Sequence, residues 1–123
     1  MAYDAHDFAA FAACVTPDWV EHHFERESRL EDLPEMMAQG KVAFPDWRTE
    51  LLLELAEDDL VAMLTLTTGT HAAPYRGLKP TGRLFRMYQI NIFRIVAGRI
   101  SESWVMVGDK GGPFQQLSEP AAS

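Results

Sequence analysis

Cysteine is almost absent from this sequence: Cys14 is the only one among 123 residues. A single thiol cannot form a disulfide within the chain and cannot supply a tetrahedral thiolate metal site, so both features are excluded. The alanine-rich, helix-like surroundings of Cys14 instead predict a small side chain packed in the core.

Positive charge is also scarce, since 18 Asp and Glu residues outnumber 11 Lys and Arg residues and the formal net charge is −7. No basic run is present, which argues against nucleic acid as a partner because phosphate binding requires clustered Lys and Arg. The first residues, with Asp4 and Asp7, do not resemble the basic and apolar segments of a signal peptide. No apolar run approaches the roughly 20 residues of a membrane helix. We therefore expect a cytoplasmic protein that has one domain over residues 1–123 and no membrane partner.

Several catalytic motifs are missing as well. The sequence has no GxSxG, no GxGxxG, no phosphate-binding loop and no HExxH, so serine hydrolase, nucleotide-binding and zinc-protease interpretations have no support. His22 and His23 are adjacent, and adjacent side chains on a helix point about 100° apart, which disfavours chelation of one metal ion. No metal site is predicted.

The first 45 residues have the pattern of helices. Apolar residues within 8–15 follow the spacing of one helical face. Thr16-Pro17-Asp18 then has the cap, the proline and the acid that are typical of a helix start. We therefore expect a second helix, which would carry Trp19, Val20, His22 and His23.

A third helix is predicted after Asp32, because Asp32 and Glu35 have capping-box spacing, and Gly40 is its expected end. From Trp47 onward the pattern changes to short β-branched or leucine-rich runs that are separated by turn residues. These runs predict four strands, over Arg48–Leu55, Leu60–Thr68, Leu84–Val96 and Arg99–Val107. Helices followed by an antiparallel sheet indicate an α+β fold, and residues 118–123 are expected to form a flexible tail.

The long predicted strand Leu84–Val96 separates its side chains onto two faces. One face carries large apolar groups with two neutral amides in their middle: Phe85, Met87, Gln89, Asn91 and Phe93. Buried amides without partners cost about 1–3 kcal/mol each, so a core built only for stability would rarely contain two. The pattern favours a ligand cavity for a small apolar or aromatic molecule. Hydrogen bonds from Gln89 and Asn91 to neighbouring loops or helices would explain it equally well.

The opposite face of this strand is strongly apolar. It carries Tyr88, Ile90 and Ile92, and Trp104 of the next strand joins them. Such a face is too apolar to contact water, so we expect a homodimer through the outer face of the sheet.

A series of short strings follows one order along the chain. The strings are Pro17-Asp18-Trp19-Val20-Glu21-His22, Phe44-Pro45-Asp46-Trp47-Arg48, Gly69-Thr70-His71, Pro80-Thr81-Gly82-Arg83, Ile92-Phe93-Arg94-Ile95, Gly98-Arg99-Ile100, Glu102-Ser103-Trp104 and Gln115-Gln116-Leu117. Their order and spacing resemble the SnoaL-like polyketide cyclase family, within the nuclear transport factor two-like superfamily, over about residues 7–117. The resemblance implies a cone-shaped barrel, in which a curved antiparallel sheet wraps around N-terminal helices and encloses a cavity.

The same resemblance implies a chemistry. Family members include cyclases that close aromatic polyketide rings by an intramolecular aldol reaction, without a metal or organic cofactor. In these cyclases a buried Asp acts as the general base and polar neighbours stabilise the enolate. By position Gln89 matches a polar pocket residue, and Asn91 stands where the cyclases tend to carry His. The positions of the catalytic Asp and of its neighbouring His are Val105 and Ser103 here, so the family's aldol base is missing.

Three other residues are candidates for a proton carrier: His22, His23 and Asp109. The resemblance favours His22 in the pocket with His23 at a neighbouring polar position, although a structural role stays open for both. Asp109 is either a relocated base or an exposed acid in a turn. The expected substrate-binding residues are Gln89, Asn91, Met87, Phe85, Ser103, Val105, Trp19 and Tyr75, of which Tyr75 lies in a possible lid loop.

Two functions of different classes fit these residues. The first is a cofactor-independent cyclase, isomerase, lyase or hydrolase that acts on a small apolar, polyketide-like molecule. In it Gln89 and Asn91 orient carbonyl groups and a histidine carries protons. The alternative is a binding module that holds such a molecule without turnover, which Val105 favours. The fold alone does not choose between them.

Overall fold

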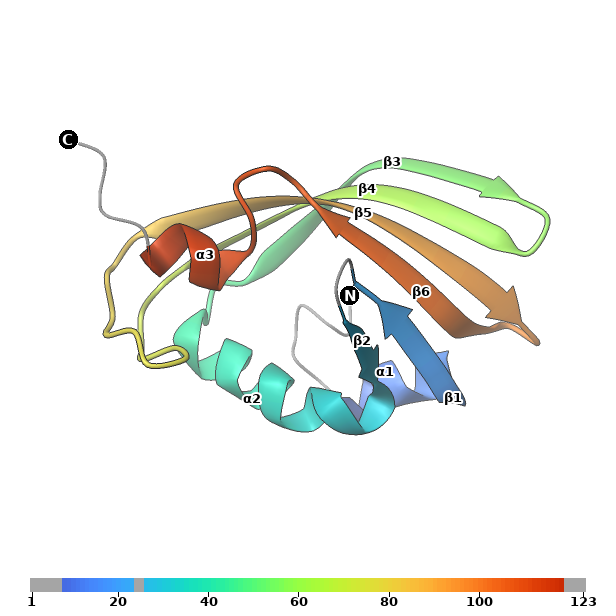
Figure 1. The fold of residues 1–123 in the computed structure, drawn as a ribbon, viewed down its shortest axis with the longest axis horizontal. Coiled ribbons are helices and arrows are strands. Elements are labelled where there is room, and N and C mark those ends of the chain that lie inside the picture. Colours follow the sequence, from blue (N-terminus) through green and yellow to red (C-terminus); the bar gives the residue numbers. More distant parts are fainter. Residues whose placement is uncertain (1–7, 24–25, 119–123) are drawn as a thin grey trace.

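The computed structural model describes residues 8–23 and 26–118, which form one curved sheet with helices on its concave side (Figure 1). The elements are α1 (Phe8–Cys14), β1 (Val15–His22), β2 (Glu27–Arg29), the 3₁₀ helix η1 (Leu30–Asp32), α2 (Leu33–Ala43), β3 (Arg48–Glu57), β4 (Leu60–Thr70), β5 (Leu84–Val96), β6 (Arg99–Val107) and α3 (Pro113–Ser118). The sheet has the order β2-β1-β6-β5-β4-β3. Ser118 of the predicted tail ends α3, and the rest of that tail, residues 119–123, lies outside the described residues.

The four long strands lie where the alternating pattern predicts them, which confirms the α+β class. β5 and β6 have the predicted bounds, and Ala97 and Gly98 between them have φ values of 51° and 78°, as a tight hairpin turn requires. The pairs β3–β4, β4–β5 and β5–β6 are antiparallel. These strands arch over α2 (Figure 1), so the sheet is curved, but among the described residues it does not close into a barrel.

The predicted second helix is wrong, because residues 15–22 form strand β1. β1 runs parallel to β6 and places Glu21 opposite Ser103, so the sheet is not wholly antiparallel. Thr16 does not cap a helix, since its hydroxyl donates to the Asp18 carboxylate at 2.7 Å. Pairing with a strand far away in the sequence has overridden the local helix-start signal, as tertiary context commonly does.

Helix α2 is present, but its ends differ from the prediction. The Asp32 carboxylate accepts a hydrogen bond from the Arg29 N–H at 2.8 Å, which caps the preceding 3₁₀ helix η1, and it does not form the predicted capping box with Glu35. Glu35 accepts from the Gln39 amide at 3.4 Å. The helix also continues past Gly40, which is buried within it. A glycine costs a helix about 1 kcal/mol relative to alanine, and packing of the buried side of α2 outweighs that cost.

Helix α1 has no fully buried residue. Cys14 is therefore exposed, contrary to the predicted core position, and its Sγ donates to the Ala10 carbonyl at 3.4 Å. Phe8 and Phe11 instead pack against the core cluster around Trp19. The side of this short helix that faces the core carries Phe8 and Phe11, and Cys14 lies on another side.

The core consists of two clusters, one near each end of α2. One contains Val15, Trp19, Leu33 and Met37, and the other contains Ala43, Phe44, Phe85, Met87 and Leu117. Close packing in the second cluster requires Gly69, because a Cβ there would lie 2.8 Å from a ring carbon of Phe85. In the described part of the chain, no helix combines the length and the apolar character that crossing a membrane requires.

Candidate functional site

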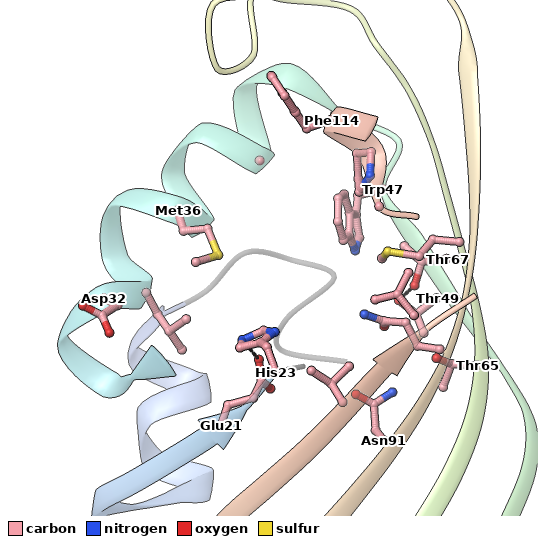
Figure 2. A pocket seen from close by; sticks show the side chains of 18 of the residues that line it. Glu21, His23, Asp32, Met36, Trp47, Thr49, Thr65, Thr67, Asn91 and Phe114 are labelled. Atoms are coloured by element: carbon pink, nitrogen blue, oxygen red, sulfur yellow. Dashed lines mark hydrogen bonds and ion pairs between the residues drawn. The ribbon is translucent and has the colours of Figure 1, made fainter. Parts of the chain in front are cut away.

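A cavity of about 670 Å³ lies between the inner face of the sheet and the helices. Figure 2 shows Thr49, Thr65 and Asn91 on its sheet side and Met36 on the α2 side. Other parts of the lining come from β1, β6, α1, α3 and the loop that contains Tyr75. The volume is within the usual range of small-molecule sites.

The sheet wall of the cavity carries neutral polar groups that have no hydrogen-bond partner within residues 8–23 and 26–118. Gln89 and Asn91 of β5 line the cavity, and neither side-chain amide hydrogen bonds to a described residue. Thr65 of β4 lies opposite Gln89 in register, and its buried hydroxyl has no hydrogen-bond partner among the described residues. The amides therefore do not bond to loops or helices in the described structure. Each of these groups is available to a ligand.

Apolar groups surround this polar patch. They include Met36, Trp47, Met63, Met87, Phe93, Val105 and Phe114. Tyr75, the predicted lid residue, lines the cavity and packs edge to face on Phe44 with ring centroids 4.9 Å apart. Next to it, the Arg76 guanidinium lies 4.9 Å from the centroid of the Phe114 ring. The loop that contains Tyr75 and Arg76 therefore meets α3 beside the cavity.

Two predicted substrate-binding residues lie behind the cavity wall rather than on it. Phe85 is fully buried in the core. Ser103 is also buried, and its hydroxyl accepts a hydrogen bond from Trp19 Nε1 at 3.0 Å. Trp19 lines the cavity, but with 2% exposure it belongs mainly to the core. The first strand and β6 are joined here by a buried side-chain hydrogen bond.

His22 lies on the outer face of the sheet, not in the cavity. On a strand, successive side chains point to opposite faces, so the 100° separation expected for a helix does not apply. His22 Nε2 lies 2.6 Å from Glu102, its Nδ1 lies 3.3 Å from Glu27, and its ring stacks on Trp104 with centroids 5.5 Å apart. The expectation that His22 is the pocket histidine is therefore corrected.

His23 lines the cavity together with Glu21, which the sequence analysis did not select. Glu21 belongs to β1 and His23 directly follows it; their side chains lie side by side (Figure 2), and His23 Nε2 lies 3.1 Å from Glu21 Oε1. The same nitrogen lies 3.0 Å from the hydroxyl of Ser28, which is buried. Alternation along residues 19, 21 and 23 would have indicated Glu21 if this segment had been identified as a strand.

The electrostatics of this pair follow from its burial. Burial raises the pKa of Glu21 above its ordinary value, and the positive charge of Arg26 offsets part of that rise. Burial lowers the pKa of His23, and Arg26 and His22 lower it further. Both shifts favour the uncharged form of each group, so the pair has its proton-accepting histidine largely neutral near pH 7.

Asp109 does not line the main cavity. It is exposed in the turn after β6 and borders a smaller adjoining pocket, which it shares with His23, Arg26 and Val105. Val105 borders both spaces. Nowhere in residues 8–23 and 26–118 do three or more His, Cys, Asp or Glu side chains group in a way that could hold a metal ion.

Comparison with known proteins gives one consistent result. The family profile described as "SnoaL-like polyketide cyclase" matches residues 1–117. The chain is 34% identical over 113 residues to the aklanonic acid methyl ester cyclase DnrD of Streptomyces peucetius, covering 90% of this chain and 61% of that protein. It is 32% identical over 105 residues to the corresponding cyclase AcmA of Streptomyces galilaeus, covering 83% and 57%. The chain thus spans less than two thirds of the length of these curated relatives.

Solved structures give the same fold. AclR, a candidate hydroxylase from Streptomyces galilaeus, superimposes with a TM-score of 0.78 at 29% identity, covering 87% of this chain and 80% of that one. IdmH, a candidate polyketide cyclase from Streptomyces antibioticus, gives 0.75 at 26% identity, covering 94% and 90%. The two neighbours are described by different chemistries, so the site must supply the functional argument.

Proposed function

Because the chain belongs to the SnoaL-like polyketide cyclase family, we propose that it is a cofactor-independent catalyst of the cyclase type, acting in the cytoplasm on a small apolar, polyketide-like molecule. The observation that supports this most is the polar patch of Gln89, Asn91 and Thr65, which has no hydrogen-bond partner among the described residues and lies in a largely apolar cavity. Isomerase, lyase and hydrolase reactions can use the same kind of proton transfer and remain within the proposal.

The polar patch suits a substrate that carries carbonyl oxygens. The amide N–H groups of Gln89 and Asn91 can donate to such oxygens, and a donor left unpaired in an apolar site costs about 1–3 kcal/mol. Donors that are fixed before the reaction also stabilise an oxygen that becomes negatively charged in the transition state. The same two residues would therefore contribute to both binding and rate.

The double variant Gln89→Leu/Asn91→Leu tests this role. With a polyketide-like aromatic diketone as ligand, we expect weaker binding by calorimetry and a loss of turnover of at least about 100-fold by product analysis, because oxyanion donors contribute at that level. Tyr88→Phe, on the opposite face of the same strand, is the matched control and should behave like the wild type. Unchanged binding and turnover in the double variant would contradict the proposal.

A second candidate function is a binding module without turnover. It is favoured by Val105, a buried apolar residue on the cavity wall at the position where the cyclases carry their base. The two functions differ in one measurement: incubation with ligand yields product from an enzyme, but only heat of binding from a binding module.

We also propose that the protein forms a homodimer through the outer face of β3–β6. Apolar side chains are exposed there on each of these strands: Leu53, Leu55, Leu60, Tyr88, Ile90, Ile92 and Met106. Contiguous apolar patches of this kind usually mark an interface. A second copy of the chain fits, because in a dimer with a two-fold axis the patch of one copy packs against the same patch of the other.

A further inference from the structure

Glu21 of strand β1 and His23, which directly follows that strand, line the same cavity as the polar patch of β5. Figure 2 shows His23 and Glu21 side by side at the end of β1, with Asn91 on the neighbouring wall. His23 Nε2 is held by Glu21 at 3.1 Å and by Ser28 at 3.0 Å, whereas Nδ1 has no hydrogen bond to a described residue. A carboxylate beside one ring nitrogen keeps the proton on that nitrogen and leaves the lone pair on the other.

We propose that Glu21 and His23 form the acid–base pair of this cavity. His23 would exchange a proton with the α-carbon of a bound carbonyl compound, and Glu21 would be the positioning residue that fixes the orientation and tautomer of the ring. The inference rests on the proposed function and supplies its proton carrier.

The position of the pair relative to β6 supports this assignment. Glu21 lies opposite Ser103, and the next register pair of β1 and β6 is His22 with Trp104. Both His23 and Val105 border the small adjoining pocket. An apolar neighbour limits access of water to the imidazole and favours its neutral form. A valine on this wall is therefore compatible with a base on the adjacent strand.

The charged surroundings of His23 come from several elements. Glu21, His22 and Arg26 are its neighbours along the chain. Asp109 lies across the small pocket, and Asp32 and Glu35 lie at the start of α2. Asp32 and Glu35 are exposed, so water and salt screen their charges from the ring. Glu21 is the carboxyl group in direct contact with the ring, 3.1 Å from its Nε2.

The reaction step balances without a co-reactant. The C–H bond at the α-carbon breaks, the proton moves to Nδ1 of His23, and the electron pair moves to the carbonyl oxygen. The amides of Gln89 and Asn91 would donate hydrogen bonds to the resulting enolate. In a cyclisation, the enolate carbon then forms a bond to a second carbonyl carbon, whose oxygen takes the proton back from His23. The product is an isomer of the substrate.

Exchange of the α-protons of 2-tetralone in D₂O, followed by ¹H NMR, tests the pair without requiring the natural substrate. His23→Gln should lower protein-dependent exchange by at least about 100-fold, the usual contribution of a general base, while tetralone binding persists. Glu21→Gln should lower the plateau rate less and move the midpoint of the pH–rate profile to lower pH, because the carboxylate that favours the imidazolium is gone. His22→Gln, which changes the adjacent histidine on the outer face, should keep the wild-type plateau rate; because His22 lowers the pKa of His23, the midpoint of its profile should not move to lower pH.

Some outcomes overturn the inference. Wild-type exchange in His23→Gln, an unshifted profile in Glu21→Gln, or tetralone binding without any exchange in the wild type would each do so. Exchange without ring closure of a tethered diketone would support the pair and remove the cyclase assignment instead. Nitrogen NMR of the ligand-free protein is a separate readout: a His23 proton on Nε2 and a lower His23 pKa in Glu21→Gln support the pair, and a proton on Nδ1 contradicts it.

Discussion

At the scale of single residues, Glu21 combines a functional position with a cost in stability. Burial raises its pKa above the ordinary value of 4.5, with a smaller opposite effect of Arg26. A raised pKa means that the folded state binds the proton more tightly than the unfolded state does. Between the unfolded and the folded pKa, stability therefore falls as the pH rises. Each unit of that rise corresponds to about 1.4 kcal/mol.

Glu21→Gln should therefore stabilise the fold. We expect little difference from the wild type near pH 3, where Glu21 is protonated in both states, and a stabilisation that grows between the unfolded and the folded pKa and then stays constant. Urea unfolding at a series of pH values measures this difference. Glu50→Gln on the exposed edge strand β3 is the control and should show no such growth. A variant that is less stable than the wild type at pH 8 would contradict the prediction.

At the scale of elements, hydrogen bonds join two of the short strings noted in the sequence. These are Phe44-Pro45-Asp46-Trp47-Arg48 and Gly69-Thr70-His71. The Asp46 carboxylate accepts hydrogen bonds from the backbone N–H and the hydroxyl of Thr70, each at 2.7 Å. These bonds lower the pKa of Asp46. They tie the connection between α2 and β3 to the end of β4, next to Trp47 on the cavity wall.

Asp46→Asn should destabilise the fold by about 1 kcal/mol at pH 7, a value at the low end for charged hydrogen bonds because the site is exposed. The contribution of Asp46 is present above its unfolded pKa of 3.8 and is lost as the pH falls through the lower folded pKa. The difference between variant and wild type in thermal unfolding should therefore shrink in acid. Asp58→Asn, in the β3–β4 turn with φ 54°, is the control, because asparagine tolerates that conformation. An equal loss of stability in Asp46→Asn and Asp58→Asn would contradict the stabilising role of the Asp46–Thr70 hydrogen bonds.

The elements that sequence could predict are those whose signals are local. β5 and β6 follow from alternation and from the turn at Ala97 and Gly98, and the same alternation placed Gln89 and Asn91 on the cavity side. β1 was missed because its partner β6 lies far away in the sequence and pairs in parallel. The error then extended to the site, since a helix could not show that Glu21 and His23 share a face.

At the scale of the whole molecule, one sheet carries two apolar faces and only one of them is covered. The inner face is covered by the helices and encloses the cavity, so the packed core is divided into two clusters. The outer face has no covering layer among the described residues, and Ile90, at its centre between Leu64 and Met106, is 49% exposed. The candidate ligand site therefore lies on one side of the sheet, and the proposed surface for a second copy lies on the other.

Ile90→Glu tests that second copy. In a two-fold contact a central residue lies close to its own equivalent, so the substitution brings two carboxylates into an apolar interface, where their desolvation is not compensated. Sedimentation should show a dimer for the wild type and a monomer for Ile90→Glu. Val96→Glu changes a side chain with the same 49% exposure at the end of β5 and should remain dimeric. A monomeric wild type, or dissociation of both variants, would contradict the proposed interface. Because Ile90 points away from the cavity, the monomeric variant should still bind ligand, which separates assembly from function.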